Sequence, residues 1–214
     1  MALRKRQVSA ETPVSELPAE AKAVDFTKLS CELVSDDASA RRQAARALAA
    51  MPEATALLCA RLEVEPSASV RSIIFTGLIA HPSPAAVEGL TPFLRCEDVG
   101  LRNAAIDALQ KMPHEVIPCM DLLLADPDSD VRIMAVNILG LLQHPAAPAR
   151  LLLVAIDDPH VNVCAAALDA LAEVGEPEAI PMLECVAHRF PEVPFIKYAV
   201  ATAVRRIRGG AETA

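Results

Sequence analysis

One nine-residue pattern recurs along this chain every 30 to 33 residues, and it constrains the fold more than any other feature. Residues 70–78 and 131–139 show it clearly: apolar side chains recur at helical spacing, and a basic residue holds the second position. That second position falls at residues 41, 71, 102, 132, 164 and 197. Each copy predicts a helix with one apolar face. Six copies predict an array of units, each burying its apolar face only against its neighbours.

Prolines and acidic residues mark the ends of each unit. Pro113 and Pro145 follow two of the copies, and proline ends one helix but suits the first turn of the next. A second helix is therefore predicted after each turn, for example over residues 116–124 and 179–186. Acidic loops such as 126–130 precede the next copy, where carboxylates can cap free backbone N–H groups. The predicted unit is a helical hairpin.

The unit over residues 126–139, Asp-Pro-Asp-x-x-Val-Arg-x-x-Ala-x-x-x-Leu, resembles the short bacterial HEAT repeat of the phycobilin-lyase type. The resemblance covers about residues 26–207. It implies an all-α fold, a right-handed α-solenoid of five to six HEAT-like helical hairpins. First helices are expected on the convex side and second helices on the concave side. Cys164 replaces the basic residue of the fifth copy, and residues 26–34 resemble an unpaired second helix, as expected of deviating terminal repeats.

The composition agrees with helices packed through small side chains. The chain is 53% apolar but only 3% aromatic, and it has 17 prolines against 7 glycines. Long β-branched runs are missing, which disfavours sandwiches, barrels and glycine-looped nucleotide-binding folds. Three segments are predicted: a disordered N-terminal tail over residues 1–25, the repeat array over 26–208, and a disordered C-terminal tail over 209–214.

Charge and apolar patterning exclude several classes of partner. The basic residues 4–6 are not followed by an apolar stretch, so no secretory signal is predicted, and no apolar run of about 18 residues could span a membrane. A net charge of −8 with few aromatic residues disfavours nucleic-acid binding. The six cysteines form no CxxC pair and are expected to be reduced, structural thiols. We therefore expect a cytoplasmic protein that binds neither membranes nor nucleic acid.

No constellation of residues indicates catalysis, a cofactor or a metal. The loop 126–130 resembles the first half of a calcium loop but lacks the required glycine and glutamate. His81, His114 and His144 lie at successive turns of repeats stacked about 8–10 Å apart, so a shared zinc ion would need favourable rotamers and an additional carboxylate. We interpret them as polar turn residues. The repeated arginines are expected to bond neighbouring carboxylates or loop carbonyls. The chain is therefore predicted not to be an enzyme.

The second helix of the fourth unit carries the predicted partner-binding surface. Arg150 is the only polar side chain between residues 146 and 156, so this helix should leave an apolar patch exposed. A tighter local superhelix or a terminal segment lying in the groove would also account for it. Arg95, Asp121 and Glu184 each lie three positions after a proline of a second helix. They are therefore expected to share one face of the second helices. The predicted binding residues are Arg95, Asp121, Arg150, Leu153, Val154 and Glu184.

These features predict a non-catalytic adaptor or scaffold that holds a partner protein in its concave groove. The partner should offer an apolar anchor surrounded by basic residues. Two alternatives remain open. The resemblance implies a bilin lyase subunit or another maturation factor for a cofactor protein, although the scarcity of aromatic residues disfavours tetrapyrrole packing. An accessory regulator of a bacterial signalling complex is equally compatible with the array.

Overall fold

The computed structural model describes the backbone of residues 19–211 and the side chains of residues 25–209. Most of the two predicted tails lies outside these residues. Helix α1 (Ala19–Glu32) begins within the predicted N-terminal tail, and α12 (Pro194–Ala211) ends within the predicted C-terminal tail. Every regular element between them is an α-helix or a short 3-10 helix.

The predicted helical hairpins are present in the predicted order. The helices that carry the repeated pattern are α2 (Ala38–Leu48), α4 (Ala68–Ala80), α6 (Val99–Gln110), α8 (Ser129–Leu141), α10 (Val161–Val174) and α12. The second helices are α1, α3 (Thr55–Val64), α5 (Pro84–Leu90), α7 (Pro113–Leu124), α9 (Ala147–Asp157) and α11 (Ile180–Arg189). Three 3-10 helices lead into or extend second helices: η1 (Pro52–Ala54), η2 (Thr91–Arg95) and η3 (Pro177–Ala179).

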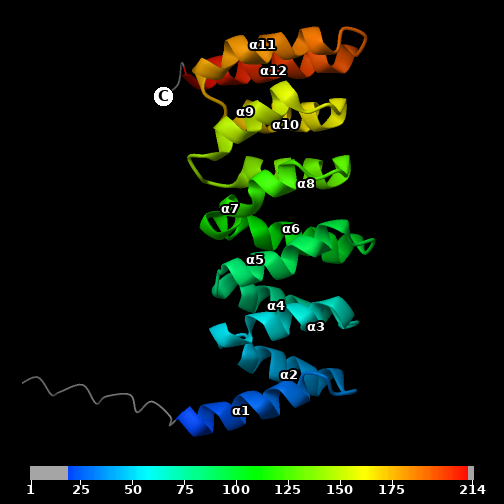
Figure 1. The fold of residues 1–214 in the computed structure, drawn as a ribbon, viewed down its shortest axis with the longest axis vertical. Coiled ribbons are helices and arrows are strands. Elements are labelled where there is room, and N and C mark those ends of the chain that lie inside the picture. The colour runs from blue at the N-terminus through cyan, green and yellow to red at the C-terminus, as the bar shows by residue number, and fades with distance from the viewer. Residues whose placement is uncertain (1–18, 212–214) are drawn as a thin grey trace, which may run out of the picture.

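The helices stack in chain order into one elongated array (Figure 1). Each even-numbered helix packs on the next, so that α10 contacts α8 on one side and α12 on the other. One hydrophobic core runs through the described array, from Leu33 to Ile207. The predicted α-solenoid is confirmed.

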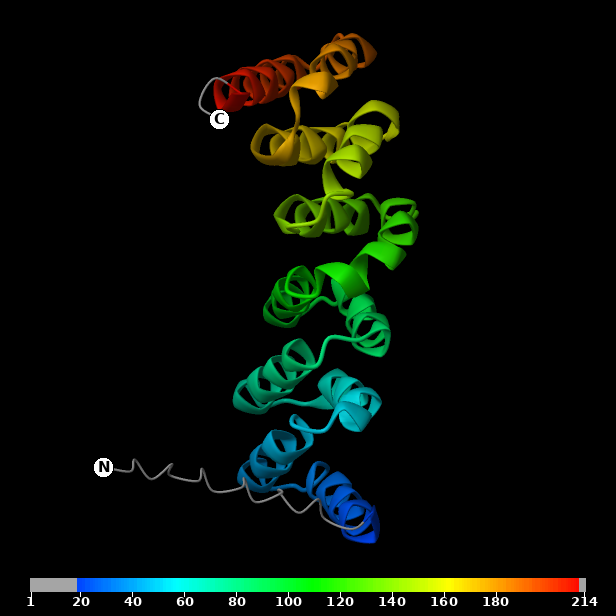
Figure 2. The same ribbon diagram turned by 90° about the vertical axis from the view of Figure 1, so that its left-hand side faces the viewer.

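The array bows in the direction opposite to the prediction. Figure 2 shows two layers, with the odd-numbered second helices bulging outward at α7 and the even-numbered helices on the inner side. Small residues bring neighbouring inner helices close together. A Cβ atom at Gly77 would lie 2.5 Å from the Cβ of Ala49, and one at Gly140 would lie 2.8 Å from the Cβ of Ala170. The outer helices α3 and α5 also approach closely, because a Cβ at Gly89 would lie 2.6 Å from the Cβ of Cys59. The second helices lie on the convex side.

The acidic loops cap the following helices, as predicted. Asp37 accepts a hydrogen bond from the backbone N–H of Ser39 at the start of α2. Asp98 accepts one from Leu101 at the start of α6, and Asp128 caps α8 in the same way. Asp128 of the calcium-like loop therefore has a structural role at the start of a helix.

The repeated arginine fastens each repeat to its own preceding loop. Four such arginines each donate a hydrogen bond to the carbonyl oxygen six residues earlier: Arg41 to Ser35, Arg71 to Glu65, Arg102 to Cys96 and Arg132 to Asp126. Three of them also bind a carboxylate of the following loop: Arg41 binds Glu65, Arg71 binds Asp98 and Arg132 binds Asp158. The predicted structural role of these arginines is confirmed, and each of these three joins successive repeats.

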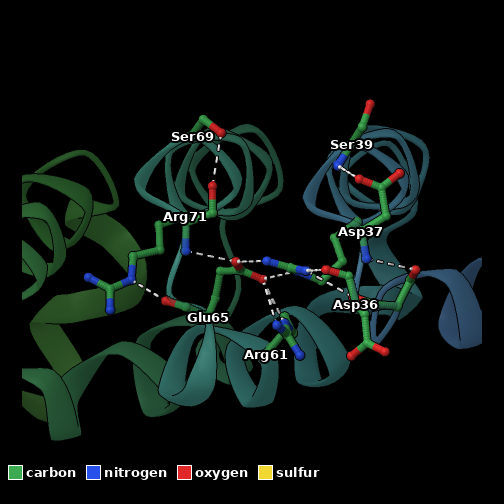
Figure 3. A network of polar contacts seen from close by, with 10 residues as sticks. Asp36, Asp37, Ser39, Arg61, Glu65, Ser69 and Arg71 are labelled. Atoms are coloured by element: carbon green, nitrogen blue, oxygen red, sulfur yellow. Dashed lines mark hydrogen bonds and ion pairs between the residues drawn. The ribbon is translucent and has the colours of Figure 1, made fainter.

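Glu65 is the most enclosed carboxylate of this series (Figure 3). It accepts hydrogen bonds from Arg41 at 3.0 and 2.9 Å, from Arg61 at 2.8 Å and from the backbone N–H of Ser67 at 2.9 Å. Burial alone would raise the pKa of Glu65, but these hydrogen bonds and the nearby positive charge lower it from 4.5 to about 2. Glu65 is therefore ionised at neutral pH, although its side chain is fully buried.

Candidate partner-binding groove

A groove of about 450 Å³ lies between α7 and α9. Four of the six predicted binding residues line it: Asp121, Arg150, Leu153 and Val154. The remaining lining residues come from the ends of these helices, the loops that follow them and α8: Leu124, Ala125, Asp126, Arg132, Asp157, Asp158 and Pro159. Since α7 and α9 are second helices, the groove belongs to the convex layer and not to the predicted concave surface (Figure 2).

Helix α9 exposes apolar surface, as its sequence predicts. Leu151 and Ala155 are fully buried, whereas Leu153 is 60% exposed. Val154 is half-buried and packs against the core. Helix α9 contacts α8, α10 and α11, which cover the opposite part of its surface. The exposed leucine results because an almost entirely apolar helix is packed on only part of its circumference.

Acidic side chains outnumber basic ones in the lining, with four aspartates against two arginines. Arg150 donates from Nε to Asp121 Oδ1 at 2.8 Å, which joins α9 to α7. Arg132 binds Asp158 with two hydrogen bonds of 2.7 and 3.0 Å. Asp157 is exposed and has no ionic partner among the described residues. The groove therefore offers an exposed leucine beside an unpaired carboxylate.

The loop after α9 is held by a contact that the repeat pattern does not predict. Cys164 occupies the position of the repeated arginine, and its thiol lies 3.2 Å from the carbonyl oxygen of Asp158, six residues earlier. Arg189, from the end of α11, donates to the same oxygen at 2.8 Å and also bonds Ile156 O. A guanidinium from the next hairpin thus replaces the one missing from the fifth copy.

The two remaining predicted residues lie outside the groove lining. Arg95 forms an ion pair with Asp126, so it supports a lining residue without lining the groove itself. Glu184 lines a separate hollow between α11 and α12 and pairs with Arg208 at 3.4 Å. The prolines used to align the second helices occupy different positions: Pro92 lies in η2, Pro118 within α7, and Pro181 near the start of α11.

Several groove residues were missed because the prediction considered helix faces only. Asp126, Asp157 and Asp158 belong to the ends of the second helices and the loops that follow them. Asp126 and Asp158 each stand six residues before a position of the repeated arginine. That spacing was available in the sequence and would have indicated that both lie beside the following repeat.

The histidines and thiols show no arrangement typical of a reactive centre. The rings of His114 and His144 meet edge to face with centroids 5.8 Å apart. Residues 25–209 contain no cluster of histidine, cysteine or acidic side chains that could hold a metal. Burial, followed by the charge of Glu63, raises the pKa of Cys59 to about 11. Desolvation also raises the pKa values of Cys119 and Cys164.

None of the described helices is both long and apolar enough to cross a membrane.

Comparison with known proteins agrees with the repeat architecture. Residues 116–205 match the family model described as HEAT repeats. An engineered protein is 20% identical with a TM-score of 0.44, covering 86% of this chain and 99% of its own. A designed armadillo repeat protein is 17% identical with a TM-score of 0.39, covering 85% and 99%. The complex of CpcE and CpcF of phycocyanin lyase from Nostoc sp. PCC7120 includes a chain that is 20% identical with a TM-score of 0.36, covering 94% and 100%.

No curated protein matches the chain in sequence. The family match spans α7 to α12, and the same stacked hairpins continue through the preceding helices. The predicted resemblance to HEAT repeats is therefore confirmed over residues 116–205, and the described part of the chain is an array of stacked helical hairpins.

Proposed function

We propose that this protein is a non-catalytic adaptor that binds a partner protein in the groove between α7 and α9. The exposed side chain of Leu153 is the observation that carries this proposal, because it offers apolar surface within a charged lining. Protein interfaces combine an apolar centre with a polar rim, and a few central residues supply most of the binding energy. Leu153 is placed to be such a residue.

The partner is proposed to carry an apolar anchor next to a basic residue. The anchor would pack on Leu153, and the basic residue would lie beside Asp157, whose carboxylate has no ionic partner among the described residues. The Arg150–Asp121 pair already neutralises one side of the groove. The six cysteines are free, which supports a reducing, cytoplasmic compartment for this interaction.

Affinity capture with matched variants tests the proposal. Leu153→Glu should abolish recovery of the partner while leaving the helical circular dichroism and the thermal midpoint unchanged. Leu122→Glu is the control, because Leu122 is 78% exposed on α7 but does not line the groove. Asp157→Lys should weaken recovery without changing stability. If every captured protein binds Leu153→Glu as strongly as the unmodified chain, the groove is not the binding surface.

A further inference from the structure

Two hollows lie on the inner layer of the array, one on each side of α4. One hollow of about 430 Å³ lies between α2 and α4, and another of about 490 Å³ lies between α4 and α6. Thr76 lines both, so the two hollows adjoin. Since the even-numbered helices form the inner layer (Figure 2), these hollows are separate from the groove beside Leu153 in the outer layer.

The surface of α4 between the hollows is uncharged and open to solvent. Six side chains of α4 that line the hollows are exposed or half-buried: Ala68, Ser72, Ile73, Thr76, Ile79 and Ala80. We refer to them as the inner surface of α4. The hydroxyl of Thr76 donates to the carbonyl oxygen of Ser72 at 2.8 Å, so it needs no further polar partner. Helix α4 is therefore, like α9, an almost uncharged helix packed on only part of its circumference.

Two arginines of α2 adjoin this surface and have no ionic partner among the described residues. Arg46 lines the hollow between α2 and α4. Arg42 lies four residues earlier, on the same face of α2, and its Nε atom is buried without a hydrogen-bond partner. In the repeat register these arginines correspond to Ser72 and Thr76 of α4, which line the second hollow. Like charges four residues apart in a helix repel each other, and a bound carboxylate would offset that repulsion.

The hollow beside Arg46 is basic, although the chain is acidic. Arg46 and His81 line it, and none of its described lining residues is a carboxylate. On the other side of α4, the lining charges are balanced, with Arg71 bound to Asp98. The net charge of −8 would by itself attract a basic partner, whereas the local charge at α2 favours an acidic one.

We propose that the inner surface of α4 binds an acidic segment of a partner protein. Carboxylates of that segment would pair with Arg42 and Arg46, and a bulky apolar side chain would pack on Ile73 and Ala80. A second copy meeting the same face would bring the arginines of the two chains together, which opposes that arrangement. The groove beside Leu153 is proposed to accept a basic partner, so the two surfaces differ in the charge that they select, and neither depends on the other.

Three synthetic peptides of equal length test the charge preference. Each carries two central leucines, flanked by glutamate, glutamine or lysine. The glutamate peptide should bind the full chain about tenfold more tightly than the glutamine peptide in fluorescence anisotropy at low salt. The lysine peptide reports on the groove beside Leu153, so Leu153→Glu should weaken the binding of that peptide alone. Equal binding of the glutamate and glutamine peptides would overturn the proposal, whatever the lysine peptide does.

Matched variants assign the preference to this surface. Arg46→Glu should abolish it, whereas Arg205→Glu changes the net charge equally at an exposed position of α12 and should preserve it. Ala80→Glu places a carboxylate in the hollow and should weaken binding of the glutamate peptide about tenfold, whereas Ala60→Glu at an exposed position of α3 should not. An unchanged preference in Arg46→Glu, or the same loss in Arg205→Glu, would contradict the assignment. Self-association in sedimentation that Arg46→Glu removes would overturn it in favour of a second copy.

Discussion

The guanidinium of Arg189 donates a hydrogen bond of 2.8 Å to the backbone carbonyl of Asp158, a contact made by the repeated arginine in four other copies. Cys164 holds the arginine's place in this copy and can make only a weak thiol contact with the same oxygen. The guanidinium that binds this carbonyl therefore comes from the end of α11 and not from α10. This exchange ties the last hairpin to the loop that borders the candidate groove.

Replacement of Arg189 should loosen that loop. Arg189→Ala removes charged hydrogen bonds to Asp158 and Ile156, so we expect a loss of about 1–2 kcal/mol in the free energy of unfolding. Urea denaturation followed by circular dichroism measures it. Arg46→Ala is the matched control, since Arg46 is exposed and its side chain makes no hydrogen bond to any described residue, and its effect should stay below about 0.5 kcal/mol. Equal effects would show that Arg189 does not replace the missing arginine.

Removal of the Glu65 charge should be far more damaging. Glu65→Gln leaves the buried guanidinium of Arg41 and the nearby Arg61 without their shared carboxylate. Breaking a buried ion pair from one side costs about 3–5 kcal/mol, and we expect a loss of that size in urea denaturation. Glu63→Gln changes an exposed carboxylate two residues away and should have little effect. Comparable losses in both variants would contradict the structural role of Glu65.

The same carboxylate makes stability depend on acidity. The pKa of Glu65 is about 2 in the folded chain against 4.5 for an ordinary glutamate, so the ionised form stabilises the fold. This contribution is complete above pH 4.5 and is lost as the pH falls toward 2. Its full size is about 3 kcal/mol, because each pKa unit corresponds to about 1.4 kcal/mol. The free energy of unfolding, measured from pH 6 downward, should decrease more steeply for the unmodified chain than for Glu65→Gln. Parallel curves would contradict the lowered pKa.

The fold was predictable because one supersecondary unit is repeated in register. The apolar spacing around Arg71 and Arg132, and the prolines that follow, fixed where helices begin and end. The direction of the bow was not predictable from one unit alone. It depends on how closely neighbouring helices approach, and contacts such as Gly140 with Ala170 appear only when two units are stacked.

The candidate site was predictable only in part for the same reason. Leu153 was expected to be exposed because its helix is apolar all round, and the structure confirms this exposure. The placement of Arg95 and Glu184 required the relative rotation of three second helices, for which their prolines are a poor guide. The contact of Arg189 with Asp158 joins residues 31 positions apart and leaves no sign in the local pattern.

The two sides of α9 should respond differently to truncation. Leu151 is fully buried, so Leu151→Ala should cost about 2–5 kcal/mol through lost burial and a residual cavity. Leu153→Ala should change stability by less than about 0.5 kcal/mol, because Leu153 is 60% exposed. Thermal and urea unfolding of both variants measure the difference. A large loss in Leu153→Ala would mean that this leucine is packed and unavailable to a partner.

The close approach of α8 and α10 predicts a coupling between Gly140 and Ala170. Alanine is normally favoured over glycine in a helix by about 0.5–1 kcal/mol, but the new Cβ at residue 140 would lie 2.8 Å from the Cβ of Ala170. Overpacking of this kind costs about 1–3 kcal/mol, so Gly140→Ala should be destabilising overall. Gly209→Ala in α12 meets no atom within 4 Å and should not be destabilising.

A double-mutant cycle assigns the Gly140 effect to this one contact. Ala170→Gly removes the opposing methyl group. The free energy of unfolding of the double variant should therefore be about 1 kcal/mol higher than the sum of the two single effects predicts. Urea denaturation of the four chains gives that coupling energy. A coupling energy near zero, or stabilisation by Gly140→Ala alone, would mean that α8 and α10 can separate freely.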